Sequence, residues 1–155
     1  MHVRLHKTHM PGIELTFDPS RFDLKAIHAF LSETYWSPGV PISIVEKAIV
    51  GSLCIGALSE GTQIGFARLV TDRATFAYLA DVFVLPEYRG RGVSKQMLER
   101  LFAHPDVQGL RRMMLATRDA HDLYKKFGFA PLAAPARFME LHNPNAYTAK
   151  PPGAA

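Results

Sequence analysis

Apolar side chains recur at two different spacings along the first half of the chain. Leu24, Ile27 and Leu31 follow helical spacing, which predicts a helix over about residues 22–34. The other elements predicted there are a strand at 13–17, a helix at 43–51 and a hairpin of strands at 53–60 and 63–72 around Gly61-Thr62. Helices and strands therefore alternate from the start.

The segment 75–85 is apolar at nearly every position, as a strand covered on both faces should be, so we expect it to be central. After it, Val93, Met97 and Leu101 predict a helix that ends near Pro105. The last predicted elements are a strand at 111–117, a helix from Asp119, its cap, to Gly128 and a strand at 137–141. A meander followed by strand-helix units indicates an α+β or α/β layered domain.

The length and composition are those of one ordinary globular domain. The chain has 155 residues, of which 48% are hydrophobic and 21% charged. We expect a single domain over residues 13–142. A flexible segment, 1–12, should precede it, and a loose tail rich in proline and alanine, 143–155, should follow it.

The single cysteine and the absence of long apolar runs bear on the compartment. Cys54 lies in an apolar run and has no second cysteine to pair with, so we interpret it as a buried structural thiol in a reducing environment. The longest uncharged run, 48–59, is too short to span a membrane. The N-terminus has basic residues but no apolar core behind them, so we expect a cytoplasmic protein without a membrane partner.

The net charge of +4 fits a nucleic-acid partner, an anionic small ligand or simple solubility. Arg111 and Arg112 are the best evidence for nucleic acid, but no long basic run interleaved with aromatics exists, so we expect no such partner. His2, His6 and His9 have irregular spacing and no accompanying carboxylate, so we expect no metal.

The junction at residues 86–94 carries the clearest chemical signal. The apolar run ends in a proline, after which arginine and glycine alternate as Arg89-Gly90-Arg91-Gly92, and a helix begins. The first N–H groups of a helix have no internal partner and attract anions, and glycines leave the backbone accessible to a phosphate. The junction therefore predicts a site for a pyrophosphate.

This junction resembles the acetyl-coenzyme A signature of the GNAT superfamily of N-acetyltransferases, Arg/Gln-x-x-Gly-x-Gly/Ala, which follows a central strand. Arg89 and Gly92 match it, and Ser94 stands where the family prefers glycine or alanine. Serine is small and keeps its N–H, so we expect the change to be tolerated.

A second match lies about thirty residues further on, in the order that the family has. Residues 119–129 resemble the family's later helix, N-x-x-A-x-x-L-Y-x-k-x-G-F, although Thr117 replaces the usual asparagine. The residues that fit are Ala120, Leu123, Tyr124, Gly128 and Phe129. The resemblance implies a GNAT-type acyl-CoA N-acyltransferase fold, with a mixed central sheet of about six or seven strands and about four helices.

The resemblance also implies the activity. Such a protein moves an acetyl group from acetyl-CoA, its cosubstrate, to a primary amine of a small molecule or protein by direct attack in a ternary complex. The alternative is a module that binds acetyl-CoA as a sensor without turnover. The residues that would bind the cofactor are Val82, Phe83, Val84, Arg89, Gly90, Arg91, Gly92, Val93, Ser94, Thr117 and Tyr124.

Two residues are candidates for proton transfer. Asp81 is a carboxylate in an otherwise apolar strand, where burial would favour a base, or else it is a structural aspartate bonded to a neighbouring loop. Glu33 and Glu140 are weaker candidates. Tyr124 matches the family's general acid for the departing thiolate, or else it is a core residue that contacts the cofactor sulfur.

The acceptor should lie near Tyr35 and Trp36, on the loop rich in proline and glycine at 33–41. These aromatics could stack on an amine or form a lid, or they could instead plug the sheet edge. Proteins that this chain resembles often form homodimers, so a homodimer is a further expectation.

Overall fold

The computed structural model describes residues 12–147 of the chain. Residues 1–11 and 148–155, which hold most of the two predicted terminal segments and His2, His6 and His9, lie outside this range. The chain forms two compact units, one ending at Leu115 and the other beginning at Ala116. None of the helices in the described range has the length and apolar character that a membrane crossing requires.

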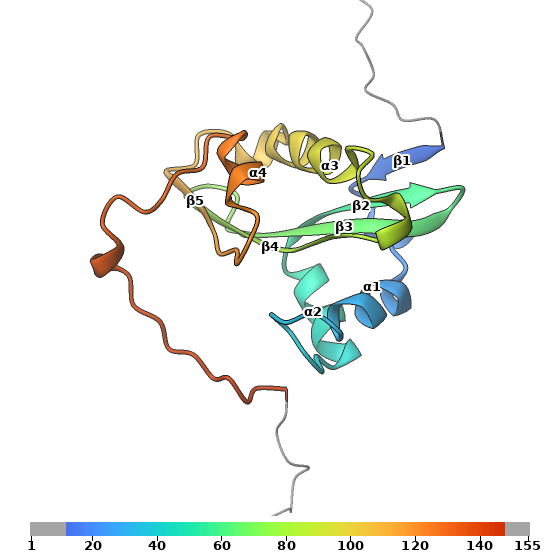
Figure 1. Ribbon diagram of the computed structural model, residues 1–155, viewed down its shortest axis with the longest axis horizontal. Helices are drawn as coiled ribbons and strands as arrows, with labels where there is room; N and C mark the ends of the chain where they lie inside the picture. Colours follow the sequence, from blue (N-terminus) through green and yellow to red (C-terminus); the bar gives the residue numbers. More distant parts are fainter. Residues whose placement is uncertain (1–11, 148–155) are drawn as a thin grey trace, which may run out of the picture. The chain divides into compact units, whose positions relative to one another are not determined.

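The first unit is built on one mixed sheet with the strand order β1-β2-β3-β4-β5. The strands are β1 (Ile13–Thr16), β2 (Leu53–Ser59), β3 (Thr62–Thr71), β4 (Phe76–Val84) and β5 (Arg112–Leu115). The first four are antiparallel neighbours, and β5 runs parallel to β4 (Figure 1). The predicted mixed sheet is confirmed, with five strands in the described residues instead of six or seven.

Helices cover both faces of this sheet. The helices α1 (Leu24–Leu31) and α2 (Ile42–Val50) lie on one face, and α3 (Val93–Phe102) lies on the other (Figure 1). On the first face, the rings of Phe30 and Phe83 stack with centroids 4.1 Å apart. On the second face, a Cβ added to Gly65 would lie 3.2 Å from the Met97 side chain, so the glycine lets α3 pack closely against β3.

Local sequence explains where these elements begin and end. The Asp23 side chain accepts a hydrogen bond from the Ala26 N–H at 3.0 Å, so α1 begins at Leu24, later than predicted. The hairpin turn lies at Glu60 and Gly61, one residue before its predicted place, because Ser59 pairs with Thr62. Both turn residues have positive φ (49° and 81°), as the tight turn between twisted strands requires.

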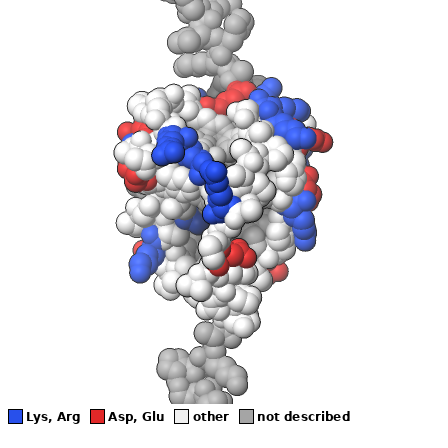
Figure 2. Space-filling view, turned by 90° about the vertical axis from the view of Figure 1, so that its left-hand side faces the viewer, with Lys and Arg blue, Asp and Glu red and all other residues white. Residues whose placement is uncertain are grey.

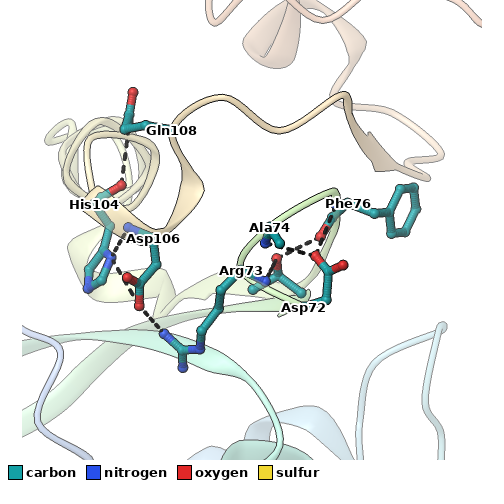
Figure 3. A network of polar contacts seen from close by, with 8 residues as sticks. Asp72, Arg73, Ala74, Phe76, His104, Asp106 and Gln108 are labelled. Carbon is teal, nitrogen blue, oxygen red and sulfur yellow. Dashed lines mark hydrogen bonds and ion pairs between the residues drawn. The ribbon is translucent and has the colours of Figure 1, made fainter.

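The turn between β3 and β4 is organised by one carboxylate. Asp72 accepts hydrogen bonds from the Thr75 hydroxyl at 2.6 Å and from the N–H groups of Thr75, Ala74 and Phe76 (Figure 3). These bonds, the hydroxyl above all, hold the pKa of Asp72 below its usual value. Arg73, at φ 63°, belongs to this turn. Its Nη1 donates to the Oδ2 of Asp106, beyond the end of α3, at 2.5 Å.

The second unit contains α4 (His121–Lys125). The helix ends at Lys125 with Lys126 as its C-cap residue, earlier than predicted. Gly128, the predicted cap, lies in the turn that follows: at φ 92° it donates to the Lys125 carbonyl, while the Phe129 N–H donates to the Tyr124 carbonyl. The prediction that Asp119 caps the start of α4 is wrong, because the N-cap residue is Ala120, which makes no side-chain hydrogen bond. The 3₁₀ turns of the two units are Pro19–Arg21, Pro86–Tyr88, Pro105–Val107 and Pro135–Arg137.

The predicted strand at residues 137–141 is wrong. Residues 138–147 form no strand, and Arg137 ends a 3₁₀ turn that begins at Pro135. A strand needs a neighbour to satisfy its backbone groups, and within residues 12–147 no strand pairs with this segment. Met139 and Leu141 are fully exposed, so their apolar character alone does not produce a strand here.

Cys54 is buried, which confirms the interpretation of a structural thiol. Burial raises the pKa of this thiol to about 12. Because thiolate is the reactive form, the native protein at pH 8 should react with a disulfide reagent such as DTNB roughly a thousandfold more slowly than the chain unfolded in guanidinium. The release of thionitrobenzoate measures both rates, and equal rates would contradict this account.

Candidate functional site

The turn between β4 and α3 exposes its backbone. Gly90 and Gly92 both have φ 77°, in the left-handed region that favours glycine. Gly92 is the N-cap residue of α3 and has no side chain to cap the helix. A Cβ built on either glycine would have no heavy atom within 4 Å, so the space beside the turn is open.

The start of α3 leaves N–H groups for a ligand. The first hydrogen bond of this helix runs from the Gln96 N–H to the Gly92 carbonyl at 3.0 Å. The N–H groups of Val93, Ser94 and Lys95 therefore have no partner within the helix. With the accessible backbone of the preceding turn, they form the arrangement of donors that binds a phosphate.

The two arginines of the turn act differently. The Arg89 Nε donates to the Val84 carbonyl at 2.9 Å, so this side chain fixes the turn to the end of β4. The Arg91 guanidinium lies 5.5 Å from the centre of the Tyr88 ring and so remains beside the turn. The sequence indicated the charge of both residues but not the structural bond of Arg89.

Strand β4 has an open edge directly before this turn. Its pairing with β3 extends to Val84, whereas β5 pairs with it only from Phe76 to Leu79. In the described chain, residues 80–84 have no strand on the β5 side. Val82, Phe83 and Val84 lie in this stretch, where an extended ligand could pair with the backbone as an added strand would.

A β-bulge interrupts β4 at Asp81. Phe66 pairs with Phe83 and Arg68 with Ala80, so two residues of β4 lie opposite one residue of β3. Asp81 has φ 55°, a left-handed conformation that aspartate tolerates better than most residues. Bulges redirect side chains, and this one occurs where the open edge begins.

The Asp81 carboxylate is held from two sides. Its Oδ2 accepts from the Arg68 Nε at 2.8 Å, and its Oδ1 accepts from the Trp36 Nε1 at 2.9 Å. The Asp81 and Arg68 side chains are 12% and 19% exposed, so this is a largely buried ion pair. Of the two interpretations that the sequence left open, the contact with a neighbouring loop is present.

The loop that carries Tyr35 and Trp36, here called the aromatic loop, is half-exposed at these two residues. The Tyr35 and Trp36 side chains are 51% and 43% exposed, and their rings meet edge to face with centroids 5.1 Å apart. The hydrogen bond from Trp36 to Asp81 was not predicted. The two residues are 45 positions apart, and the sequence signal for their partner Arg68 was only a charge within an apolar strand.

The remaining candidates lie in the second unit. The Thr117 hydroxyl accepts from the Ala120 N–H at 3.0 Å, so it shapes the start of α4. The Tyr124 ring meets the Phe129 ring edge to face at 6.0 Å. Among the residues that the structure describes, no three His, Cys, Asp or Glu side chains gather as a metal site would require.

Basic side chains lie in separate groups on one face of the protein. On the face drawn in Figure 2, Lys and Arg form several separate groups with acidic or uncharged side chains between them. Ion pairs neutralise some of them, such as Arg21 with Glu14 and Arg73 with Asp106.

Comparison with known proteins identifies the family. The sequence model of the acetyltransferase (GNAT) family matches residues 23–129. FG08082 of Gibberella zeae, named as an acetyltransferase, is 33% identical over 132 residues, which is 70% of this chain and 73% of that protein. The histone acetyltransferase TAP1 of Glycine max is 28% identical over 120 residues, 69% of this chain and 52% of TAP1.

A solved structure agrees. The crystal structure of a protein from Xanthomonas campestris pv. campestris, described as belonging to the GNAT family, superposes with a TM-score of 0.87 at 48% identity and covers 91% of this chain and 100% of that one. This chain belongs to the acetyltransferase (GNAT) family. The predicted fold class is thereby confirmed.

The geometry of the turn predicts the effect of adding one methyl group. Gly92→Ala should lower the free energy of unfolding by about 1–2 kcal/mol, because an L side chain at φ 77° is strained although no atom obstructs it. Urea denaturation measures this change. The control Ser94→Ala, inside α3, should be close to neutral, and equal stabilities of all three proteins would contradict the left-handed turn.

Proposed function

We propose that this protein is an N-acetyltransferase that moves an acetyl group from acetyl-CoA to a primary amine of a small molecule or protein, by direct attack in a ternary complex. The observation that supports it is that the open edge of β4 is followed, after the short 3₁₀ turn Pro86–Tyr88, by the glycine turn and the start of α3. When bound, acetyl-CoA supplies an acetyl group activated as a thioester.

The residues of the first unit suit this ligand in two ways. The N–H groups from Gly90 to Ser94 would hold the pyrophosphate, with each charge-assisted hydrogen bond contributing roughly 1.5–3 kcal/mol. The Arg89 N–H, also expected there, already donates to the Pro86 carbonyl. The backbone of Val82, Phe83 and Val84 would pair with the amide groups of the pantetheine arm. One N–H, from Val82 or Phe83, would polarise the thioester carbonyl as a single-donor oxyanion site.

The amine must lose a proton before it can attack. Only about one alkylammonium in a few thousand is free amine at pH 7. Both Asp81 oxygens already accept hydrogen bonds, one of them from a guanidinium, so this carboxylate is poorly placed to receive a proton. We therefore favour a water chain as the route for the proton over direct transfer to Asp81.

The departing thiolate takes a proton from Tyr124 in this proposal. The assignment rests on the match of α4 and the residues after it to the family's later helix. A thiol with a pKa near 8.5 leaves fairly well unaided. We therefore expect the Tyr124 proton to contribute less than binding and positioning do.

The first test is binding and turnover. Isothermal calorimetry should detect acetyl-CoA binding, and an amine panel should stimulate the release of free thiol. Gly92→Asp should weaken binding at least tenfold, because it adds a side chain and a negative charge beside the backbone that would hold the pyrophosphate.

Gly109→Asp is the matched control. Gly109 has φ 74° and equally open surroundings, but it lies in the turn before β5, so acetyl-CoA binding should be unchanged. Absence of binding to the native protein would overturn the proposal. Binding without thiol release from any amine would indicate the sensor instead.

The role of Tyr124 is tested by removing its hydroxyl. Tyr124→Phe should lower the turnover number about tenfold to a hundredfold and leave the dissociation constant of acetyl-CoA near normal, because the hydroxyl acts on the departing thiolate. Steady-state kinetics and calorimetry measure the two quantities. Phe127→Leu, a change at another ring of the same segment, controls for local packing, and unchanged turnover in Tyr124→Phe would remove this residue from the mechanism.

A further inference from the structure

Four side chains from distant parts of the first unit form one polar chain. Trp36, in the loop after α1, donates to Asp81 on β4, and Asp81 accepts from Arg68 on β3. Arg68 in turn donates to the Ser52 hydroxyl at 3.1 Å, directly before β2. The chain therefore connects the aromatic loop to three strands of the sheet.

We propose that Asp81 is a positioning residue that holds Trp36 beside the open edge of β4, and that the Tyr35 and Trp36 rings then bind the acceptor as a primary alkylammonium. This inference rests on the proposed function for its chemistry. The connection between loop and sheet rests on the contacts alone.

The bulge is what brings Asp81 to Arg68. Residues opposite each other in a sheet share a face, so Arg68 and its partner Ala80 lie on one face. In a regular strand the next residue, Asp81, would point to the opposite face. The bulge removes this alternation locally and lets the carboxylate reach the guanidinium.

The ion pair with Arg68 holds in place the Asp81 carboxylate to which Trp36 donates. A largely buried carboxylate and guanidinium are costly to separate, because either one left alone is an uncompensated charge. The hydrogen bond from the indole N–H is therefore made to a charged group held in place, which makes it stronger than a bond between neutral groups.

Several other hydrogen bonds of this loop are local. Thr34 and Ser37 both donate to the Leu31 carbonyl, and the Gly39 N–H donates to the Ser32 carbonyl, so these bonds stay within the helix end and the loop. The bond from Trp36 instead reaches β4. We infer that it determines where the two rings lie relative to the sheet.

This placement indicates what the acceptor is. Asp81 is followed by Val82, whose backbone belongs to the proposed thioester site. Because the charge of Asp81 is already matched by Arg68, recognition of the amine falls to the two half-exposed rings. Aromatic faces attract ammonium groups and their alkyl chains, which is the chemistry of a primary alkylammonium.

The hydrogen bond between Trp36 and Asp81 can be tested by fluorescence, without an activity assay, because Trp36 is the single tryptophan of the chain. Asp81→Gly removes both acceptor oxygens, and glycine tolerates φ 55°. Quenching by acrylamide should then increase and the fluorescence anisotropy of Trp36 should fall. Asp106→Ala breaks a different ion pair, with Arg73, and should leave both signals unchanged. Unchanged fluorescence in a folded Asp81→Gly protein would overturn the proposal.

Kinetics test the effect on the acceptor. Trp36→Phe removes the indole N–H and leaves a smaller aromatic ring at a half-exposed position, so it should fold normally even if Asp81→Gly does not. Each change should raise the KM for the amine about tenfold or more and leave acetyl-CoA affinity unchanged. The double variant should raise KM no further than one change alone, because both break the same bond.

A base would behave differently. If Asp81 accepted the proton of the amine, Asp81→Gly would lower kcat, remove the acidic limb of the pH profile and leave KM for the amine little changed, which would overturn the positioning role. An unaltered KM in Trp36→Phe would also overturn it. If no amine is acetylated, the proposed function fails by itself, and the fluorescence comparison still decides whether Asp81 holds the loop.

Discussion

The unequal pairing of β4 determines how the first unit can work. Hydrogen bonds to β3 run along β4 as far as Val84, whereas β5 accompanies only its first four residues, Phe76 to Leu79. A strand with one free edge normally invites unwanted association. Here the free edge is short, contains a bulge, and leads into a turn whose glycines and helix start also present backbone groups. The fold thus concentrates accessible N–H groups in one place, and the proposed ligand is one that uses all of them.

Two kinds of electrostatic device lie at the ends of this edge. Beyond its far end, the N–H groups at the start of α3 carry partial positive charge from the backbone, which suits an anionic ligand. At its near end, a full negative charge on Asp81 is matched by Arg68 and serves a loop. The helix start is open to solvent and suits a ligand that binds reversibly. The ion pair is largely buried and suited to holding a side chain in place.

The sequence predicted what depends on neighbours along the chain. The order of the helices and of the first five strands, and the glycine turn before α3, follow from local spacing and backbone preference. The bond between Trp36 and Asp81 depends on tertiary pairing and on one inserted residue, which no local pattern reveals. The prediction of a strand at 137–141 was wrong for a related reason. Apolar residues can form a strand, but they do not show whether a neighbouring strand is there to pair with it.

The burial of Cys54 has a practical consequence for anyone who wishes to follow this protein in solution. Because the sulfur of Cys54 is buried and its pKa is raised, a maleimide dye should not react with it in the folded state. A cysteine engineered at any exposed position would then be the single labelled atom, with no need to remove the native one. The chain is in this respect already prepared for single-site spectroscopy.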